Sequence, residues 1–137
     1  MSGVCSTTGD GRAQSLLELA LVLPVALAIL LGAASVVMFA LGLGGLQSAT
    51  AEAALVAARA PTASLAKAEA TSAFDRLTAA YPLSACRLGL RLPRGFARGS
   101  HLLAESHALV RLSWIPGTPT WQVDALATAQ IEPYRSR

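Results

Sequence analysis

The sequence predicts an α+β protein made of a long N-terminal transmembrane helix, a second, amphipathic helix and a small three-stranded antiparallel sheet. Two observations predict this class. No side chain carries a formal charge from Leu19 through Ala51, and a run of that length is typical of a membrane-spanning helix. After Pro61 the apolar spacing changes to that of an amphipathic helix and then to the two-residue alternation of strands. A chain of 137 residues leaves room for one modest soluble core beside the apolar segment.

The apolar segment is long enough to cross a bilayer. Its 28 residues from Leu19 to Leu46 would extend roughly 42 Å as a helix, against a hydrocarbon core of about 30 Å. A cleaved secretory signal is disfavoured, because the apolar core of such a signal normally has about 7 to 15 residues. Pro24 is expected to kink the helix or to loosen its start. Because Pro61 disfavours helical geometry in the residue before it, we expect the helix to end near Arg59.

The second helix is predicted from Ser64 to Tyr81 by a period of 3.6 residues. The residues that share one face are Ala66, Ala70, Phe74, Leu77 and Tyr81. The charged residues that lie mostly away from it are Lys67, Glu69, Asp75 and Arg76. Pro82 ends the helix, and its apolar face needs another element to cover it.

Three strands are predicted by alternating apolar and polar residues. The first alternation places on one face Cys86, Leu88, Leu90 and Leu92. The second places on one face Ala108, Val110, Leu112 and Trp114, and the third Trp121, Val123, Ala125, Ala127, Ala129 and Ile131. Two prolines and a glycine lie between the second and third alternations, which favours an antiparallel hairpin. A helix laid on one face of this sheet gives a single α+β core.

Small residues form a row near the end of the apolar run. They recur at every fourth position, at Gly45, Ala49, Ala53 and Ala57, and also in the pairs Ala28 with Gly32 and Ala40 with Gly44. Such rows let helix backbones approach closely in lipid. The sequence therefore predicts a helix-packing face, although a chain this rich in alanine also produces such rows by composition alone.

Four arginines form the most concentrated basic feature: Arg87, Arg91, Arg94 and Arg98. The alternation places the first two on the polar face of the first strand and the other two in the loop after it. Such a patch could hold phosphate or another anionic polymer. A solvated face, or a contact with acidic groups of a neighbouring subunit, is the simpler interpretation. We do not expect nucleic-acid binding, because the aromatic residues that stack on bases are missing nearby.

We expect no catalytic site, no metal site and no cofactor. The segment Ser64–Lys67 matches the S-x-x-K pattern of penicillin-interacting enzymes, but the companion motifs are absent. His101 and His107 are expected in a loop and at a strand start, without neighbouring zinc ligands. Cys5 and Cys86 lie on either side of the apolar segment, so a spanning segment would keep them apart.

Glu18 is the last ionised side chain before the apolar run. The segment Ser15–Glu18 has the S-x-x-E form of a capping box at a helix start, where the helix dipole also stabilises a carboxylate by about 0.3 to 1 kcal/mol. A second interpretation is chance placement in the headgroup region of the membrane. A third interpretation is functional and depends on the residues immediately upstream.

Those upstream residues read "MSGVCSTTGDGRA" and are followed by "QSLLELALVLP". They resemble type IV prepilins, in particular the TadE-like minor pilins of tight-adherence pilus systems. In that family a prepilin peptidase removes a short hydrophilic leader before a mature N-terminus whose fifth residue is Glu. A cut after Ala13, which replaces the more usual Gly, makes Gln14 the first and Glu18 the fifth residue. The alanine-rich "LQSATAEAALVAARA" and the closing "DALATAQIEP" also look like TadE-type proteins.

The resemblance implies three regions, a leader at 1–13, a transmembrane and extended helix at 14–60, and an exported α+β head with a pilin-like fold at 61–137. It also implies an assembly role for Glu18 and Pro24. In a filament the Glu18 carboxylate of one subunit would neutralise the new terminal amine of its neighbour inside an apolar core. An unpaired charge is expensive there, so this contact would set the register of the subunits.

The expected function is therefore that of a minor pilin or pilus-assembly protein, with no enzymatic activity. The expected partners are prepilin peptidase, other pilin subunits, the pilus assembly platform and the membrane. We expect a cytoplasmic N-terminus, with which Arg12 before the span agrees, and an exported head in a cell-surface pilus. The alternative is an unprocessed signal-anchored envelope protein whose basic head binds an anionic surface partner or belongs to a secretion complex.

Overall fold

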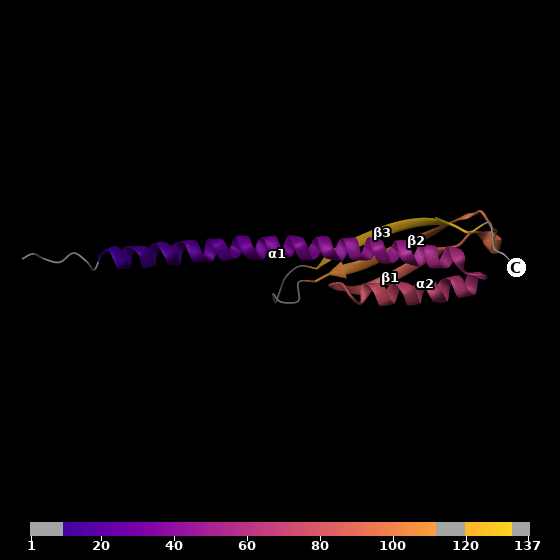
Figure 1. Cartoon of the computed structure of the whole chain (residues 1–137), viewed down its shortest axis with the longest axis horizontal. Coiled ribbons are helices and arrows are strands. Elements are labelled where there is room, and N and C mark those ends of the chain that lie inside the picture. The colour runs from indigo at the N-terminus through magenta and orange to yellow at the C-terminus, as the bar shows by residue number, and fades with distance from the viewer. Residues whose placement is uncertain (1–9, 112–119, 133–137) are drawn as a thin grey trace, which may run out of the picture. The chain divides into compact units, whose positions relative to one another are not determined.

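The computed structural model describes residues 10–111 and 120–132, with side chains from Ser15 onward within those ranges. It contains the helices α1 and α2 and the strands β1, β2 and β3, in the predicted order (Figure 1). The α+β class, with a long apolar helix, a second helix and a three-stranded antiparallel sheet, is confirmed. By their internal contacts, residues 1–36 form one unit and residues 37–137 another.

Helix α1 covers Asp10–Arg59, a length of 50 residues. It continues through Pro24, whose ring nitrogen cannot donate the usual hydrogen bond to the preceding turn. It ends at Arg59 as predicted. There the N–H of Ala60 donates to the carbonyl of Ala57 at 3.3 Å, a tightened last turn that leads into Pro61.

The start of α1 differs from the prediction. A capping box places its serine at the N-cap, outside the helix, whereas α1 begins five residues before Ser15, at Asp10. The capping-box interpretation of Ser15 and Glu18 is therefore wrong for the full chain. Glu18 lies in the third helical turn, beyond the first turn in which the helix dipole stabilises a carboxylate.

Helix α2 covers Ala63–Thr78, so its predicted end at Tyr81 is three residues too late. Thr62 is the N-cap, and its hydroxyl accepts from the N–H of Leu65 at 3.4 Å. After Thr78 the chain closes with i→i+3 bonds, including one from the N–H of Tyr81 to the carbonyl of Thr78. Pro82 keeps the residue before it out of the helical region, which places Tyr81 beyond the helix.

The three strands form one antiparallel sheet in the order β1-β2-β3. Their bounds are Leu83–Arg91, His101–Val110 and Trp121–Gln130. The predicted inner face of the first strand is confirmed, with Cys86, Leu88, Leu90 and Leu92 packed against the core. The predicted inner face of the third strand is confirmed in part: Val123, Ala125, Ala129 and Ile131 are buried and Ala127 is half-buried, whereas Trp121 is 36% exposed and has its ring centroid 6.1 Å from that of Phe39. A register shift lies between Ser84 and Arg87, where Ala85 has a positive φ of 52°.

The second strand begins six residues before its predicted start. His101 was expected in a loop and His107 at a strand start, but both lie within β2. The sequence does not alternate between apolar and polar residues in this half of the strand, because the apolar Leu103 lies on the outer side and the polar Ser106 is fully buried. Leu112 and Trp114, the other predicted inner residues, lie outside the described residues.

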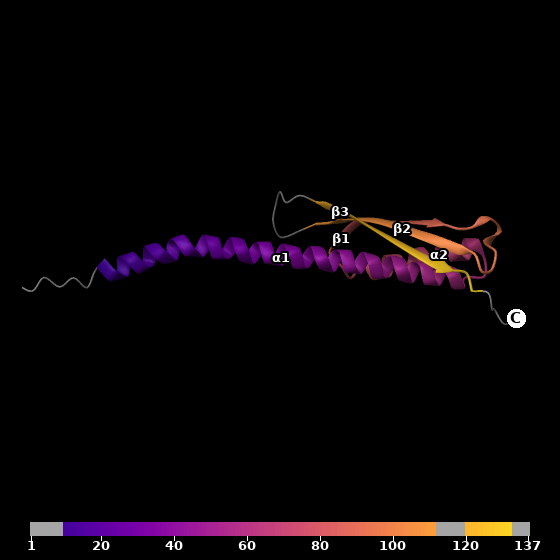
Figure 2. The same cartoon turned by 90° about the horizontal axis from the view of Figure 1, so that it is seen from above.

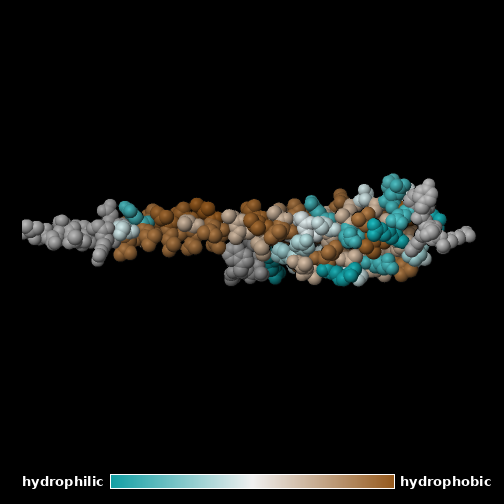
Figure 3. Space-filling view, viewed as in Figure 1, coloured by the Kyte–Doolittle hydropathy of each residue, from teal (hydrophilic) through white to brown (hydrophobic). Residues whose placement is uncertain are grey.

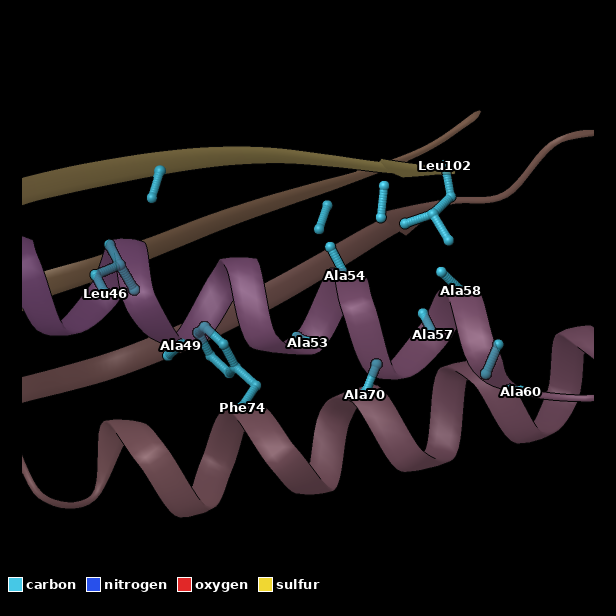
Figure 4. Packing of buried hydrophobic residues seen from close by; sticks show 14 of the residues in the cluster. Leu46, Ala49, Ala53, Ala54, Ala57, Ala58, Ala60, Ala70, Phe74 and Leu102 are labelled. Atoms are coloured by element: carbon cyan, nitrogen blue, oxygen red, sulfur yellow. The ribbon is translucent and has the colours of Figure 1, made fainter. Parts of the chain in front are cut away.

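The core of residues 37–137 is built largely from alanine. The second half of α1 lies along one face of the sheet (Figure 2), and buried residues of α1, α2 and the strands form one cluster. Figure 4 shows Ala49 of α1 beside Phe74 of α2, and Ala57 beside Ala70. These side chains are small, so the helix backbones can come close together, and Phe74 is the largest fully buried side chain of this core.

One polar pair lies inside this core. The hydroxyl groups of Thr50 on α1 and Ser106 on β2 are 2.5 Å apart, and both residues are fully buried. Thr50 also donates to the carbonyl of Leu46 at 2.7 Å. Ser106 must therefore donate to Thr50, which satisfies both hydroxyl groups and fixes the helix to the sheet at one position along its length.

Candidate functional site

The first part of α1 is an exposed apolar surface. Every described side chain from Ser15 to Ala33 is exposed, including Leu16 at 67%, Leu21 at 71% and Leu30 at 67% of their full accessible area. Figure 3 shows this stretch as a nearly unbroken hydrophobic surface. Within the described chain α1 is the one helix that is long and apolar enough to cross a membrane. By its length and composition, a helix with such a surface could span a membrane.

Glu18 lies at the start of this apolar surface. Its side chain is exposed and forms no ion pair with any described residue. Four residues upstream, the peptide bond between Ala13 and Gln14, the predicted cleavage position, lies within the helical backbone of α1. Pro24 follows Glu18 by six residues on the same helix. The three positions thus fall within the first fifteen residues of α1.

The row of small residues has its packing partner within the chain. Ala49, Ala53 and Ala57 are completely buried, and a methyl group on Gly45 would overlap the ring of Tyr81. The row therefore packs α1 against the rest of the head. The pairs outside the row differ, because Gly32 and Gly44 have open space around them and Ala28 and Ala40 are exposed.

The four arginines are all exposed but do not form one cluster of equivalent charges. Arg87 and Arg91 lie on the outer face of β1, as predicted, four residues apart. Arg91 forms an ion pair with Glu105 of β2 at 3.1 Å. Arg94 lies in the short 3-10 turn Arg94–Phe96, and Arg98 lies in the loop after it. Arg91 is thus partly neutralised, whereas the other three form no ion pair among the described residues.

A charged row crosses the outer face of the sheet and was not found from the sequence. Register places Arg87 of β1 beside His107 of β2, and His107 beside Asp124 of β3. The Nδ1 atom of His107 lies 2.6 Å from Oδ1 of Asp124. This hydrogen bond, aided by a weaker one from Gln122, lowers the pKa of the Asp124 carboxyl. The signal that could reveal this row is the strand register, which the periodicity alone does not supply.

The described residues offer no grouping suited to metal binding. They contain no cluster of three or more His, Cys, Asp or Glu side chains that could hold a metal ion. Burial raises the pKa of the Cys86 thiol, and the nearby Asp75 charge acts in the same direction against a hydrogen bond with Thr78. This thiol is therefore not a reactive thiolate at neutral pH. A shallow groove of about 450 Å³ between the helices is lined by Ser48, Glu52, Val56, Ala73, Arg76 and Leu77.

Comparison with models of protein families, with curated proteins and with solved structures gives no match to this chain.

Proposed function

We propose that this protein is a membrane-anchored subunit of the TadE-like minor pilin type, which assembles with other pilin subunits through α1. The observation that carries the proposal is Glu18, an exposed carboxylate at the edge of an uncharged and exposed apolar helix. Such a helix is stable only in lipid or against other apolar helices. A carboxylate carried into either environment needs a cation, and no described residue of the chain supplies one to it.

In this proposal the cation is the terminal amine that cleavage creates. Gln14 and Glu18 are separated by four residues, or roughly 6 Å of helix rise, and would form a weak pair within one chain. Subunits stacked with a stagger would instead bring the carboxylate of one chain to the amine of the next. The cost of an unpaired charge in an apolar core then favours one register over all others.

Cleavage by prepilin peptidase requires the start of α1 to open, because the bond between Ala13 and Gln14 is helical in the full chain. The first turn of a helix is the easiest part to open, since its N–H groups have no acceptor within the helix. Replacing Ala13 with Gly should therefore increase the processed fraction, both because Gly destabilises the helix and because it is the usual residue of the family that this chain resembles. Ala13→Leu should decrease it.

A second function, an unprocessed anchor whose head binds an anionic envelope component, is favoured by a different observation. Arg87, Arg94 and Arg98 are exposed and without ion pairs among the described residues. Arginines in this state are available to phosphate or carboxylate groups of a partner. In this function Glu18 has no role, and the arginines carry the binding.

The test is the N-terminus of the protein purified from membranes of cells that contain a prepilin peptidase. Intact mass should show a chain that begins at Gln14 and retains 137 − 13 = 124 residues. A chain that begins at Met1 in the presence of active peptidase would contradict the pilin proposal. It would favour the second function, an unprocessed anchor whose head binds an anionic envelope component.

A matched pair of substitutions tests the role of Glu18 in assembly. Glu18→Gln should leave membrane insertion intact and remove the protein from sheared surface pili. Glu52→Gln is the control, because Glu52 is also an exposed carboxylate on α1 but belongs to the head. Equal pilus incorporation of the two variants would refute an assembly role for Glu18.

A further inference from the structure

The two edges of the sheet are unequally protected against pairing with another chain. Strand β3 pairs with β2 residue for residue along all of Trp121–Gln130. It contains no proline and no bulge, and Asp124 is its one charged residue. Natural edge strands usually carry prolines, bulges or several charged residues, which prevent another strand from pairing with them. Among the described residues no strand pairs with the outer edge of β3, which therefore offers ten residues to another strand.

Strand β1, at the other edge, is irregular only near its start. The register shift is confined to the segment between Ser84 and Arg87, and Arg87–Arg91 pairs regularly with β2. Both β1 and β3 are antiparallel to β2, so they run in the same direction. A second copy placed beside the first, with its α1 in the same direction, thus presents β1 parallel to β3.

We propose that copies of this chain associate side by side, with β3 of one copy paired in parallel with β1 of the next, Asp124 beside Arg87 and Leu126 beside Gly89 of the neighbouring copy. The inference rests on the proposed function only for the common direction of the α1 helices, which insertion into one membrane imposes. A two-fold pairing of β3 with β3 would point the two helices in opposite directions.

Charge complementarity supports this register. Arg87 has no ion pair among the described residues. In Asp124, the Oδ1 atom accepts from His107 and Gln122, while Oδ2 has no described donor. With one copy's β1 beside the other's β3, the row Arg87, His107, Asp124 continues across the interface, and the guanidinium of the next copy meets the free carboxylate oxygen.

Shape complementarity supports the same register. Leu126 is 71% exposed on the outer face of β3, and register puts it in one row with Glu105 and Gly89. Gly89 is not required by its own chain, because its φ is not positive and an added Cβ would make only an ordinary 3.7 Å contact with the Glu105 carbonyl. A glycine in a strand costs stability, but at this position it leaves room for Leu126 of the neighbouring copy.

The arrangement is heterologous, since one edge meets a different edge of the next copy. An interface of this kind continues into a ring or an open array rather than closing as a dimer. On the inner side, Leu88 and Leu90 of one copy would come beside Ala125 and Ala127 of the other, so apolar residues would continue across the interface.

Cysteine cross-linking in membranes tests the pairing. Two differently tagged chains, one Gly89→Cys and one Leu126→Cys, are co-expressed in a Cys5→Ser, Cys86→Ala background and oxidised. Adjacent strands bring these Cα atoms within the roughly 4.4 to 6.8 Å that a disulfide needs. Within one chain β2 separates the two positions by two strand spacings, roughly 9.6 Å, so an internal disulfide cannot form.

The expected result is a mixed dimer, and a ladder of larger products when both cysteines are in one chain. Gln122→Cys with Gly89→Cys is the control, because Gln122 lies on the same face of β3 four residues, or roughly 13 Å, away. Self-linking of Leu126→Cys alone would overturn the proposal in favour of two-fold β3 pairing. Absence of the mixed dimer would overturn it as well.

The N-terminus of the same membrane sample separates this proposal from the pilin function. A start at Gln14 without the mixed dimer refutes the side-by-side pairing alone. A start at Met1 with the mixed dimer supports the pairing and refutes the pilin function. Gly89→Val in an Arg91→Cys chain should reduce its mixed dimer with a Thr128→Cys chain several-fold without lowering the Tm. Arg91 and Thr128 fall in one row of the same register, and Arg87 and Asp124 keep their charges in this pair. A loss of Tm, or an unchanged yield of dimer, would contradict the role given to Gly89.

Discussion

At the residue scale, the buried pair of Thr50 and Ser106 is asymmetric. The Thr50 hydroxyl donates to the Leu46 carbonyl and accepts from Ser106, whereas the Ser106 hydroxyl has Thr50 as its one acceptor. Thr50→Val therefore leaves the buried Ser106 hydroxyl without an acceptor and should lower the free energy of unfolding by about 1 to 3 kcal/mol. Ser106→Ala should cost less than about 1 kcal/mol. Urea unfolding of the full chain in detergent measures both.

The double variant Thr50→Val, Ser106→Ala provides the control for this pair. It removes both hydroxyl groups and should be no less stable than Thr50→Val alone, because no unsatisfied donor remains. If the two single losses simply add in the double variant, the hydroxyl groups are not coupled and the asymmetry has another cause.

The outer-face pair of His107 and Asp124 gives a prediction about pH. The hydrogen bond from His107 lowers the pKa of Asp124 below its ordinary value of 3.8. The contribution of this bond to folding is therefore present above that value and is lost as the pH falls through the lowered pKa. An NMR titration of the Asp124 carboxyl should show a midpoint below 3.8, and His107→Ala should raise it.

The matched control for that titration is His101→Ala. His101 is an exposed histidine at the start of the same strand, and register places it opposite Gln130 instead of Asp124. The midpoint of Asp124 should not change in this variant. An equal change in both variants would assign the lowered pKa to the general charge of the sheet face.

At the element scale, two adjacent glycines of α1 should respond in opposite ways to the same substitution. A Cβ at Gly45 overlaps the ring of Tyr81, whereas Gly44 has nothing within 4 Å. Gly45→Ala should therefore cost about 1 to 3 kcal/mol through overpacking. Gly44→Ala should be neutral or stabilise by up to about 1 kcal/mol through helix propensity. Equal effects on urea unfolding would show that Tyr81 does not pack on α1.

Elements with a clear period could be predicted from the sequence, and those without one could not. The inner residues of β1 and β3 alternate strictly, and Pro61 set the end of α1, so these features were predicted correctly. Strand β2 was placed too late because Leu103 and Ser106 interrupt its alternation. The helix start was misjudged at Ser15, since residues upstream of a local capping motif also form helix.

Sites that depend on contacts between elements were beyond the sequence. The row from Gly45 to Ala57 could be recognised as a packing surface, but its partners, α2 and Tyr81 of the same chain, depend on the tertiary fold. Likewise, His107 and Asp124 are 17 residues apart and meet only through the register of β2 and β3. Periodicity assigns residues to faces, whereas the pairing of faces depends on packing energies that no single segment contains.

At the scale of the whole molecule, the exposed leucines of α1 lie on two parts of the helix, one outside the head and one within it. Leu27 and Leu30 are exposed on its bare first part, while Leu55 is exposed on the part that belongs to the head. If only the first part lies in lipid, Leu27→Arg with Leu30→Arg should oppose insertion by about 6 to 8 kcal/mol, because each Leu-to-Arg change costs about 3 to 4 kcal/mol near the centre of a membrane helix. The protein should then be lost from alkali-washed membranes.

The same chemical change in the head is the control for that experiment. Leu55→Arg with Leu65→Arg replaces two leucines that are 46% and 43% exposed on α1 and α2. These side chains already tolerate water in the folded head, so the variant should stay in alkali-washed membranes at the level of the unmodified protein. Retention of the Leu27, Leu30 variant would show that the uncharged run does not span the bilayer. Loss of the Leu55, Leu65 variant would show that lipid also contacts the part of α1 that belongs to the head. Glu18 would then lie at a different depth in the bilayer, and so would the cation that pairs with it.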